Sequence, residues 1–497
     1  MGSASVSLCT LVRPELAFRG EGIQFLASKV KQIVVIDTQP FSGAGRLVER
    51  VGAVHVKHHW QDSFALARNA GLEAVESECV LILDGNERIE NEAFTKIESI
   101  TAAGVAEDEV HCFRVDVLDR AGEIIESTYE PRLWRSSASI EYVGRVYERL
   151  NTAEDIRFVF HDDIRVIQLD EVEDPAERAA IVQRNIDLLE RQIEEHPEDS
   201  HTQYCLGLQT MLLGEYETAY EVFTEVRAVE GSSDRGKSAL VFAVECLRQL
   251  DRPKEAFQLG LDGARTADDY GELWFFLGRA ALEADMRIKA DAAFKYASRI
   301  PESATPALFR DPTISEWRGR LGQAQALASL REVKDAENVL QSIREYMPIG
   351  KAAEVDIDFI RIWLQLDQPS LAWATLEPWL DDMPAWCAIS FVEILEYFWH
   401  AKGPHSTYRF FQECLVAHNA FIKQLSVASV GAALAELNED EESHFELLRL
   451  CIDLDSKDAQ HYATLSRILV QRGELEYAKE IADLGRALPE LPPGSAP

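Results

Sequence analysis

The first third of the chain alternates short, unbroken apolar runs with longer amphipathic stretches. Residues 6–12 are a strand candidate, and the unbroken apolar runs cover residues 33–36 and 80–83. The amphipathic stretches cover residues 20–31, 43–51 and 63–75. Unbroken apolar runs of this length are typical of parallel strands that are buried on both faces. The alternation of strand and helix therefore predicts an α/β sheet with right-handed crossovers, which extends to about residue 168.

Two of these predicted strands run directly into an aspartate. Asp37 follows the second strand, and Asp84 follows the third. In open α/β sheets, ligands bind beyond the carboxyl ends of the strands. We therefore expect a binding site at this edge, although an aspartate at a strand end also commonly caps the turn that follows.

From about Asp174 onward, small and large apolar residues recur at helical spacing instead. The clearest unit starts at Trp274, and its small residues at 278, 290 and 297 match the tetratricopeptide pattern of paired helices. Alanines expected at helix crossings occur at 219, 256, 290, 336 and 372, close to the typical period of ~34 residues except for one longer step across residues 301–312. The pattern predicts a stacked helical array with a concave face, and an irregular helical bundle is the alternative.

Length and charge restrict the possible partners. A chain of 497 residues with 46% hydrophobic residues is long enough for two or three folded domains. Its formal net charge of −35 argues against binding to nucleic acid or to anionic lipid. The simple explanation is an acidic, well-solvated surface, and a concave acidic face that receives a basic peptide is the second interpretation.

The eight cysteines are scattered through apolar runs without any Cys-x-x-Cys pair, which favours free thiols in a reducing compartment. We see no secretory signal and no stretch of about 20 apolar residues, so we expect no membrane span. These features together predict a cytoplasmic protein.

Several short segments carry a resemblance to a known family. They read Leu-Val-Arg-Pro-Glu at 11–15, Ile-Asp-Thr-Gln-Pro-Phe-Ser at 36–42, Asp-Ser-Phe-Ala-Leu-Ala-Arg-Asn at 62–69, Leu-Asp-Gly-Asn-Glu at 83–87, Pro-Arg-Leu-Trp-Arg at 131–135, Tyr-Val-Gly-Arg-Val-Tyr-Glu at 142–148 and Arg-Asn-Ile-Asp-Leu-Leu-Glu at 184–190. Residues 1–195 thereby resemble bacterial family 2 glycosyltransferases of the GT-A fold, particularly those fused to tetratricopeptide repeats. Sublancin-type S-glycosyltransferases are one branch of that group.

The resemblance implies a donor site for a UDP-sugar. It places there Glu15, Asp37, Thr38, Arg68, Asp84 and Asn86. Asp84 and Asn86 stand where the family's Asp-x-Asp motif holds Mg²⁺ or Mn²⁺ against the diphosphate. Glu87 lies close enough in sequence to compensate for the missing second aspartate, or it is a solvated turn residue, which we favour. Arg68 contacts phosphate under this interpretation, and a surface salt bridge is the alternative.

The resemblance also assigns the general base. An inverting transfer needs a carboxylate within hydrogen-bond reach of the acceptor proton, and Glu148 stands at the matching position. From the residues alone, Glu148 is equally well an exposed residue at the start of a helix.

Four departures from the family pattern cluster around the same site. Asn86 replaces an aspartate, Tyr147 replaces the family's histidine, Gln168 opens the segment that matches its His-Tyr-Gly-Tyr, and the Gly-Ser-Thr-Asp loop is lost at 39–42. The site has therefore either shifted to weak or absent metal dependence, or it no longer turns over.

We therefore predict a GT-A glycosyltransferase domain at 1–172, a connecting helix at 173–195, tetratricopeptide-like repeats at 196–490 and a tail at 491–497. The leading hypothesis is an inverting transferase that moves a hexose or N-acetylhexosamine to a peptide or protein presented by the repeats, with a homodimer implied by the resemblance. The alternative is a catalytically degenerate protein-binding scaffold. Nucleotidyl or phosphosugar transfer is a third possibility, for which Ser-Gly-Ala-Gly-Arg at 42–46 is a faint signal.

Overall fold

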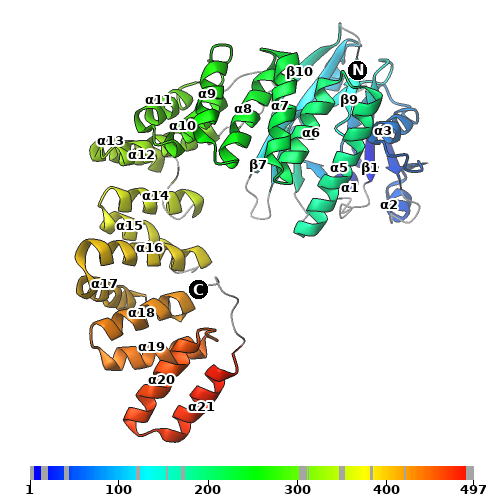
Figure 1. Cartoon of the computed structure of the whole chain (residues 1–497). Helices are drawn as coiled ribbons and strands as arrows, with labels where there is room; N and C mark the ends of the chain where they lie inside the picture. Colours follow the sequence, from blue (N-terminus) through cyan, green and yellow to red (C-terminus); the bar gives the residue numbers. More distant parts are fainter. Residues whose placement is uncertain are drawn as a thin grey trace. The chain divides into compact units, whose positions relative to one another are not determined.

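The computed structural model describes residues 5–12, 21–38, 44–118, 124–152, 155–169, 174–300, 311, 313–345, 347, 353–380, 384–418 and 421–488. The chain divides into two compact units, Met1–Gly319 and Arg320–Pro497. The division falls among helices, so the first unit contains the whole sheet together with the helices that directly follow it (Figure 1).

An eight-stranded mixed sheet forms the core of the first unit. Its strands lie in the order β3-β2-β1-β4-β7-β6-β10-β5. The parallel half consists of β1 (Val6–Val12), β2 (Gln32–Asp37), β3 (Val54–Lys57) and β4 (Cys79–Ile82). The other half consists of β5 (Glu87–Ile89), β6 (Glu109–Leu118), β7 (Ile124–Arg135) and β10 (Arg157–Leu169). The three strands predicted from apolar runs are confirmed, with boundaries that differ by one residue at most.

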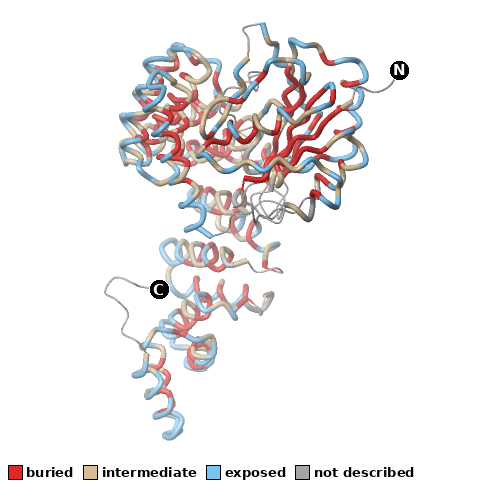
Figure 2. Tube along the Cα trace, turned by 90° about the vertical axis from the view of Figure 1, so that its right-hand side faces the viewer, coloured by how far each residue is buried: buried red, intermediate tan, exposed pale blue. Residues whose placement is uncertain are grey.

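Helices cover both faces of this sheet. The helices are α1 (Glu21–Leu26), α2 (Ala44–Val51), α3 (Phe64–Leu72) and α4 (Asn91–Ala103), so all three predicted helical stretches contain a helix. On one face, Leu81 and Val115 pack with Ile97 of α4. On the other face, Ile36 and Trp134 pack with residues of α3 and with helix α5 (Pro175–Glu195). Figure 2 shows the strands as a buried layer.

The helices that follow the sheet pack as successive pairs. In the first unit they are α6 (Ser200–Leu212), α7 (Tyr216–Glu230), α8 (Asp234–Gln249), α9 (Pro253–Gly263), α10 (Gly271–Glu283), α11 (Arg287–Ala297) and η1 (Ile314–Arg318). Gly207 and Gly278 allow close packing, because a Cβ on either would come within 2.8 Å of Phe223 or 2.7 Å of Phe294. Gly278 is one of the small residues that the repeat pattern predicted, so a repeat-like helical region is confirmed.

The second unit continues with helices alone among its described residues. They are α12 (Gly319–Ser329), which begins at the division, α13 (Val333–Arg344), α14 (Ala353–Gln365), α15 (Pro369–Leu376), η2 (Glu377–Trp379), α16 (Ala385–Lys402), α17 (Pro404–Ala417), η3 (Phe421–Lys423), α18 (Leu425–Leu437), α19 (Glu441–Asp453), α20 (Ala459–Arg472) and α21 (Leu475–Arg486). The same glycine-to-aromatic contact recurs between Gly431 and Phe411. Among the described residues, no helix is long and apolar enough to span a membrane.

Candidate functional site

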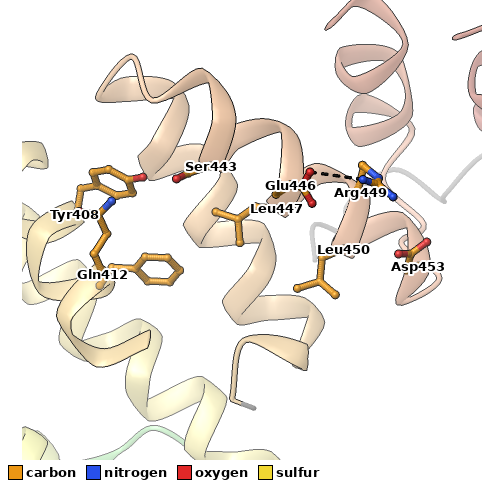
Figure 3. Close-up of a pocket in the computed structure, with 9 residues that line it drawn as sticks. Tyr408, Gln412, Ser443, Glu446, Leu447, Arg449, Leu450 and Asp453 are labelled. Atoms are coloured by element: carbon orange, nitrogen blue, oxygen red, sulfur yellow. Dashed lines mark hydrogen bonds and ion pairs between the residues drawn. The ribbon is translucent and has the colours of Figure 1, made fainter. Parts of the chain in front are cut away.

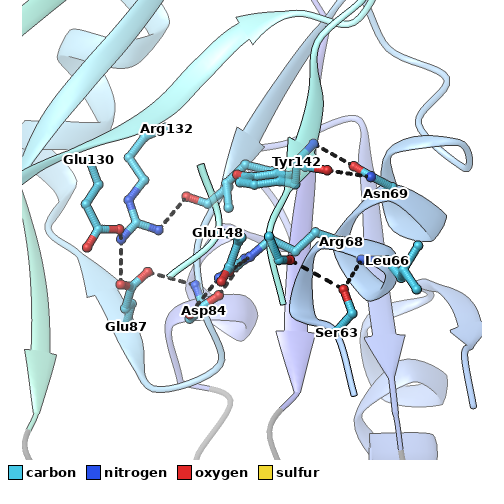
Figure 4. A network of polar contacts seen from close by, with 12 residues as sticks. Ser63, Leu66, Arg68, Asn69, Asp84, Glu87, Glu130, Arg132, Tyr142 and Glu148 are labelled. Atoms are coloured by element: carbon cyan, nitrogen blue, oxygen red, sulfur yellow. Dashed lines mark hydrogen bonds and ion pairs between the residues drawn. The ribbon is translucent and has the colours of Figure 1, made fainter. Parts of the chain in front are cut away.

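Arg68 lies at the centre of a buried polar cluster at the carboxyl edge of the parallel strands (Figure 4). Its Nη1 and Nη2 donate to the two carboxylate oxygens of Asp84, at 2.9 and 3.1 Å. Its Nε donates to Oε1 of Glu148 at 2.5 Å. Three residues that are distant in sequence, and that the sequence placed at one site, therefore meet in direct contact.

Local structure fixes each member of this cluster. Helix α3 begins after Ser63, whose Oγ accepts a hydrogen bond from the Leu66 amide at 3.3 Å. One residue after Arg68, the Asn69 side chain exchanges two hydrogen bonds with the backbone of Tyr142, at 2.8 and 2.9 Å. Asp84 lies two residues after the end of β4, and its amide donates to Oε2 of Glu87 at 2.7 Å. Arg68 is thus held on a helix while Asp84 is held at a strand end.

A second arginine extends the cluster across the sheet. Arg132 of β7 donates from Nη2 to Glu87 at 2.7 Å and to Glu130 at 2.8 Å. Burial raises the pKa of Glu87, although the charge of Arg132 opposes this shift. Burial opposes the charged form of Arg68, but the carboxylates of Asp84 and Glu148 outweigh it and hold its pKa well above the usual value. The guanidinium is therefore permanently cationic.

The hairpin that carries Glu148 is bound to the first helices beyond the sheet. Strands β8 (Glu141–Val143) and β9 (Arg149–Asn151) form this hairpin. Gln192 of α5 accepts a hydrogen bond from the Arg145 amide at 2.5 Å and donates to Thr202 of α6 at 2.5 Å. Because Gln192 is buried, its two bonds fix the hairpin loop against the helix pair.

Tyr147 occupies a strained position in the same loop. Its φ is +53°, a region that bulky residues rarely adopt. His201 of α6 lies 3.1 Å from the Tyr147 carbonyl oxygen, and Asn185 of α5 donates to the Tyr147 hydroxyl at 3.3 Å. Such backbone strain persists only where the surrounding structure enforces it, and α5 and α6 supply that constraint next to Glu148.

Asp37 lies outside the Arg68 cluster. It ends β2, whereas Asp84 follows β4, and β1 separates these two strands. Its Oδ2 lies 3.2 Å from Nε2 of His55, and its carbonyl accepts a hydrogen bond from the His58 amide at 3.0 Å. Thr38 beside it is also buried. Glu15 and the segment 39–42 lie outside the described residues.

The predicted divalent-cation site does not fit the arrangement of side chains. Both oxygens of Asp84 already accept hydrogen bonds from Arg68. Within the described part of the chain, no three His, Cys, Asp or Glu side chains are placed to share a metal ion. Asn86 lies in the turn before β5 and adds only a neutral oxygen.

Three sequence-based alternatives can now be corrected. Glu87 was expected as a solvated turn residue, but it is buried in an ion pair. Glu148 lies before a strand rather than at a helix start, and its side chain is only 10% exposed. The salt bridge of Arg68 is buried, not superficial. Arg132 and Gln192 were missed, although Arg132 belongs to the segment 131–135 that carried part of the resemblance.

The second unit contains a separate cavity of about 390 Å³ between α17 and α19 (Figure 3). Phe411, Leu447 and Leu450 supply apolar walls, and Glu446 and Arg449 on the rim pair with each other at 3.4 Å. The cavity mixes apolar and charged lining, and it carries no cluster comparable to that of Arg68.

Comparison with known proteins finds tetratricopeptide repeat proteins. Over 96 residues, the chain is 30% identical to a TPR repeat-containing protein of Synechococcus elongatus; the match covers 19% of this chain and about a quarter (24%) of that relative. Part of the chain is therefore similar to a tetratricopeptide repeat protein, in keeping with the paired helices of the helical region. The match to a thermophilic TPR protein of Thermus thermophilus covers 38% of this chain and 94% of that protein's chain, at 20% identity and a TM-score of 0.29. The match to yeast Tom70 covers 64% of this chain and 61% of Tom70, at 11% identity and a TM-score of 0.37. A scan against protein-family models found no match.

Proposed function

We propose that the sheet region binds a UDP-sugar at the carboxyl edge of its parallel strands and transfers a hexose or N-acetylhexosamine to a peptide or protein held by the repeat array. The observation that carries this proposal is the convergence of Arg68, Asp84 and Glu148. The strand order supports the location. Strands β2 and β3 lie on one side of β1, and β4 lies on the other side, so the strand order reverses at β1. In α/β sheets, ligands bind at the carboxyl ends of the strands beside such a reversal.

The roles follow from the chemistry of each group. Glu148 accepts the proton of the acceptor hydroxyl or thiol as its oxygen or sulfur attacks the anomeric carbon. The bond from that carbon to the leaving phosphate oxygen breaks, and UDP departs with the bonding electrons. Arg68 remains cationic throughout and supplies positive charge beside the leaving group. In this proposal the side chains of Glu148 and Arg68 carry the transfer.

A second candidate function is a non-catalytic scaffold, in which the repeat array binds proteins and the sheet region is structural. One observation favours it, because Arg68 forms ion pairs with Asp84 and Glu148 at the same time. While Glu148 is paired with the buried guanidinium of Arg68, it cannot accept a proton from an acceptor. The ion pair has to separate first.

We infer a reducing, cytoplasmic setting for either function, because all eight cysteines are buried and free. Free buried thiols of this kind behave as small hydrophobic groups.

Calorimetric titration of the full chain with UDP, UDP-glucose and UDP-N-acetylglucosamine, each with EDTA or with Mn²⁺, tests nucleotide binding. We expect binding of at least one nucleotide, and no binding under any condition would exclude the transferase. Release of UDP from the bound sugar nucleotide, in the presence of a cell extract as acceptor source, then separates the two functions. Glu148→Gln abolishes this release if Glu148 is the base, whereas Glu198→Gln, at an exposed site, leaves it unchanged. Release that persists at the wild-type rate in Glu148→Gln contradicts the assigned role.

A further inference from the structure

Three arginines lie together on one face of strands β5, β6 and β10. Arg165 of β10 pairs in register with Arg114 of β6. Two residues further along β10, Ile167 pairs with Arg88 of β5. Residues that pair across neighbouring strands point to the same face, and so do residues two apart along one strand. Arg88, Arg114 and Arg165 therefore share one face, which we call the arginine face.

The arginine face is turned away from α4. Val115 follows Arg114 along β6 and packs with Ile97 of α4 on the opposite face. Val110 lies earlier in β6, on the arginine face, and packs in the same hydrophobic cluster as α5 and the hairpin that carries Glu148. The arginine face is therefore a continuation of the sheet face on which the proposed base lies.

Asp116 of β6 holds two of the three arginines in place. It is fully buried, and its Oδ1 accepts hydrogen bonds from Nε of Arg114 at 2.7 Å and from Ser127 at 2.5 Å. Its Oδ2 accepts a hydrogen bond from Nε of Arg165 at 2.6 Å. Burial alone would raise the pKa of Asp116, but these hydrogen bonds outweigh burial and lower that pKa. The carboxylate therefore stays ionised and orients both guanidinium groups.

Positive charge on the arginine face remains unpaired within the described residues. There, Asp116 is the one carboxylate that pairs with Arg114 or Arg165, and Arg88 has no ion pair. The Arg165 side chain is 49% exposed and that of Arg114 is 31% exposed. Arg114 bonds through Nε in the described structure, which leaves its two terminal amino groups to bind a carboxylate side by side.

This local charge differs in sign from the whole chain, whose formal net charge is −35. At physiological ionic strength the charges of exposed groups are largely screened beyond about 8 Å. A ligand on the arginine face therefore responds mainly to the arginines next to it, and much less to the acidic remainder of the chain.

Exposed aromatic side chains border the arginines. Phe160 of β10 is 43% exposed and lies on the arginine face, because it pairs with Cys112, two residues before Arg114. Phe158, two residues earlier in β10, is 40% exposed. Tyr129 of β7 pairs with Arg114 and packs edge-on against Phe160, with ring centroids 5.9 Å apart. A partner that covers this surface meets positive charge and apolar rings in one patch.

We propose that the arginine face binds an acidic segment of a protein partner, whose carboxylates pair with the three arginines while a neighbouring apolar side chain packs on Phe160. A basic segment would add like charge to the face, and a neutral one would leave the arginines unpaired. The inference rests on the proposed function in one respect, because that function makes the acceptor the partner and places it beside Glu148. The binding itself requires no sugar transfer.

Fluorescence anisotropy of labelled peptides, titrated with the full chain, tests this binding without any sugar nucleotide. The probe is the peptide Gly-Glu-Glu-Phe-Glu-Glu-Gly, and two matched peptides carry glutamine or lysine in place of each glutamate. We expect the acidic peptide to bind roughly 10-fold more tightly than either matched peptide, and to bind more weakly as the salt concentration rises.

Variants of the chain locate the site. Arg88→Glu should weaken binding of the acidic peptide roughly 10-fold, and it leaves the pairs of Asp116 intact, so the fold does not depend on it. Arg165→Gln and Phe160→Ala should each weaken binding roughly 3-fold, through lost charge and lost apolar contact. The matched control is Arg50→Glu at the exposed end of α2, which changes the net charge equally and should leave binding unchanged. Far-ultraviolet circular dichroism confirms that each variant is folded.

Several outcomes overturn the proposal. They are no binding of the acidic peptide, equal or tighter binding of the lysine peptide, and unchanged binding in Arg88→Glu. An equal loss in Arg50→Glu also overturns it, because binding then follows the net charge of the chain. A chain that binds the acidic peptide at this face but releases no UDP retains this inference and loses the transferase. A chain that transfers sugar without binding the peptide loses this inference alone.

Discussion

Arg68 and Asp84 form a two-bond pair in which each amino group of the guanidinium donates to its own carboxylate oxygen, at 2.9 and 3.1 Å. The third nitrogen of Arg68 binds Glu148 at 2.5 Å. One cation therefore pairs with both the residue expected to bind the donor and the residue expected to act as base. This shared pairing makes Arg68 important for stability as well as for the proposed chemistry.

Arg68→Met should strongly destabilise the first unit. The substitution leaves the carboxylates of Asp84 and Glu148 close together without a cation, and loss of one partner of a buried ion pair costs about 3–5 kcal/mol. Urea unfolding followed by circular dichroism measures the loss. Arg191→Met is the control, because Arg191 and Asp62 are both about half exposed and such a pair contributes under about 1 kcal/mol.

The same experiment includes a rescue. Adding Asp84→Asn and Glu148→Gln to Arg68→Met removes both unpaired charges, so part of the lost stability should return. If Arg68→Met costs no more than Arg191→Met, the buried pair does not hold this site together.

Gln192→Met should loosen the hairpin that carries Glu148. Methionine keeps the volume of the side chain but loses the bonds to the Arg145 amide and to Thr202. The Arg145 amide then loses its partner, whereas the Thr202 hydroxyl keeps its bond to Asp199. We expect a loss of roughly 1–3 kcal/mol and faster amide hydrogen exchange across residues 141–151. Gln183→Met on the exposed side of α5 is the control. Unchanged exchange in the hairpin would show that its own strands, rather than α5, determine its position.

The sequence contained enough information for the parallel strands and for three members of the site. Unbroken apolar runs located β2 and β4, and a mostly apolar stretch located β1, because strands buried on both faces leave little choice of residue. Motif matches brought Arg68, Asp84 and Glu148 together. The ion pairs among them were not predictable, because contacts between α3, β4 and the hairpin depend on tertiary packing that no local pattern records. Gln192 was missed for the same reason: one buried amide inside a helix has no periodic signal.

His161→Gln should make stability less sensitive to acid. The rings of His111 and His161 stack at 5.1 Å, with Nδ1 of His111 2.9 Å from Nε2 of His161. Burial lowers the pKa of both histidines, and His161 lowers that of His111 further. Since the unfolded value is near 6.5, the unfolded chain binds protons first as the pH falls. The stability that the neutral pair provides is therefore present above about pH 6.5 and is lost below it, down to the folded pKa values.

The measurement is the free energy of unfolding at pH 7.5 and at pH 5, compared between wild type and variant. We expect a smaller difference between the two pH values in His161→Gln, because its amide still bonds to His111 but carries no titrating proton. His196→Gln, at an exposed histidine, should match the wild type. An equal pH dependence in both variants would mean that other groups dominate the acid response.

Gly278→Ala should destabilise the repeat array, whereas Gly271→Ala in the same helix should not. A Cβ on Gly278 would lie 2.7 Å from the ring of Phe294, which is itself buried. Such overpacking costs about 1–3 kcal/mol. A Cβ on Gly271 meets its nearest atom at 3.5 Å, an ordinary contact, and alanine at a compatible helical position stabilises by about 0.4–1 kcal/mol. The measurement is the change in the free energy of unfolding by urea in each variant. Changes of opposite sign would show that close helix packing, rather than glycine flexibility, makes Gly278 necessary. A neutral Gly278→Ala would show instead that Phe294 moves without cost.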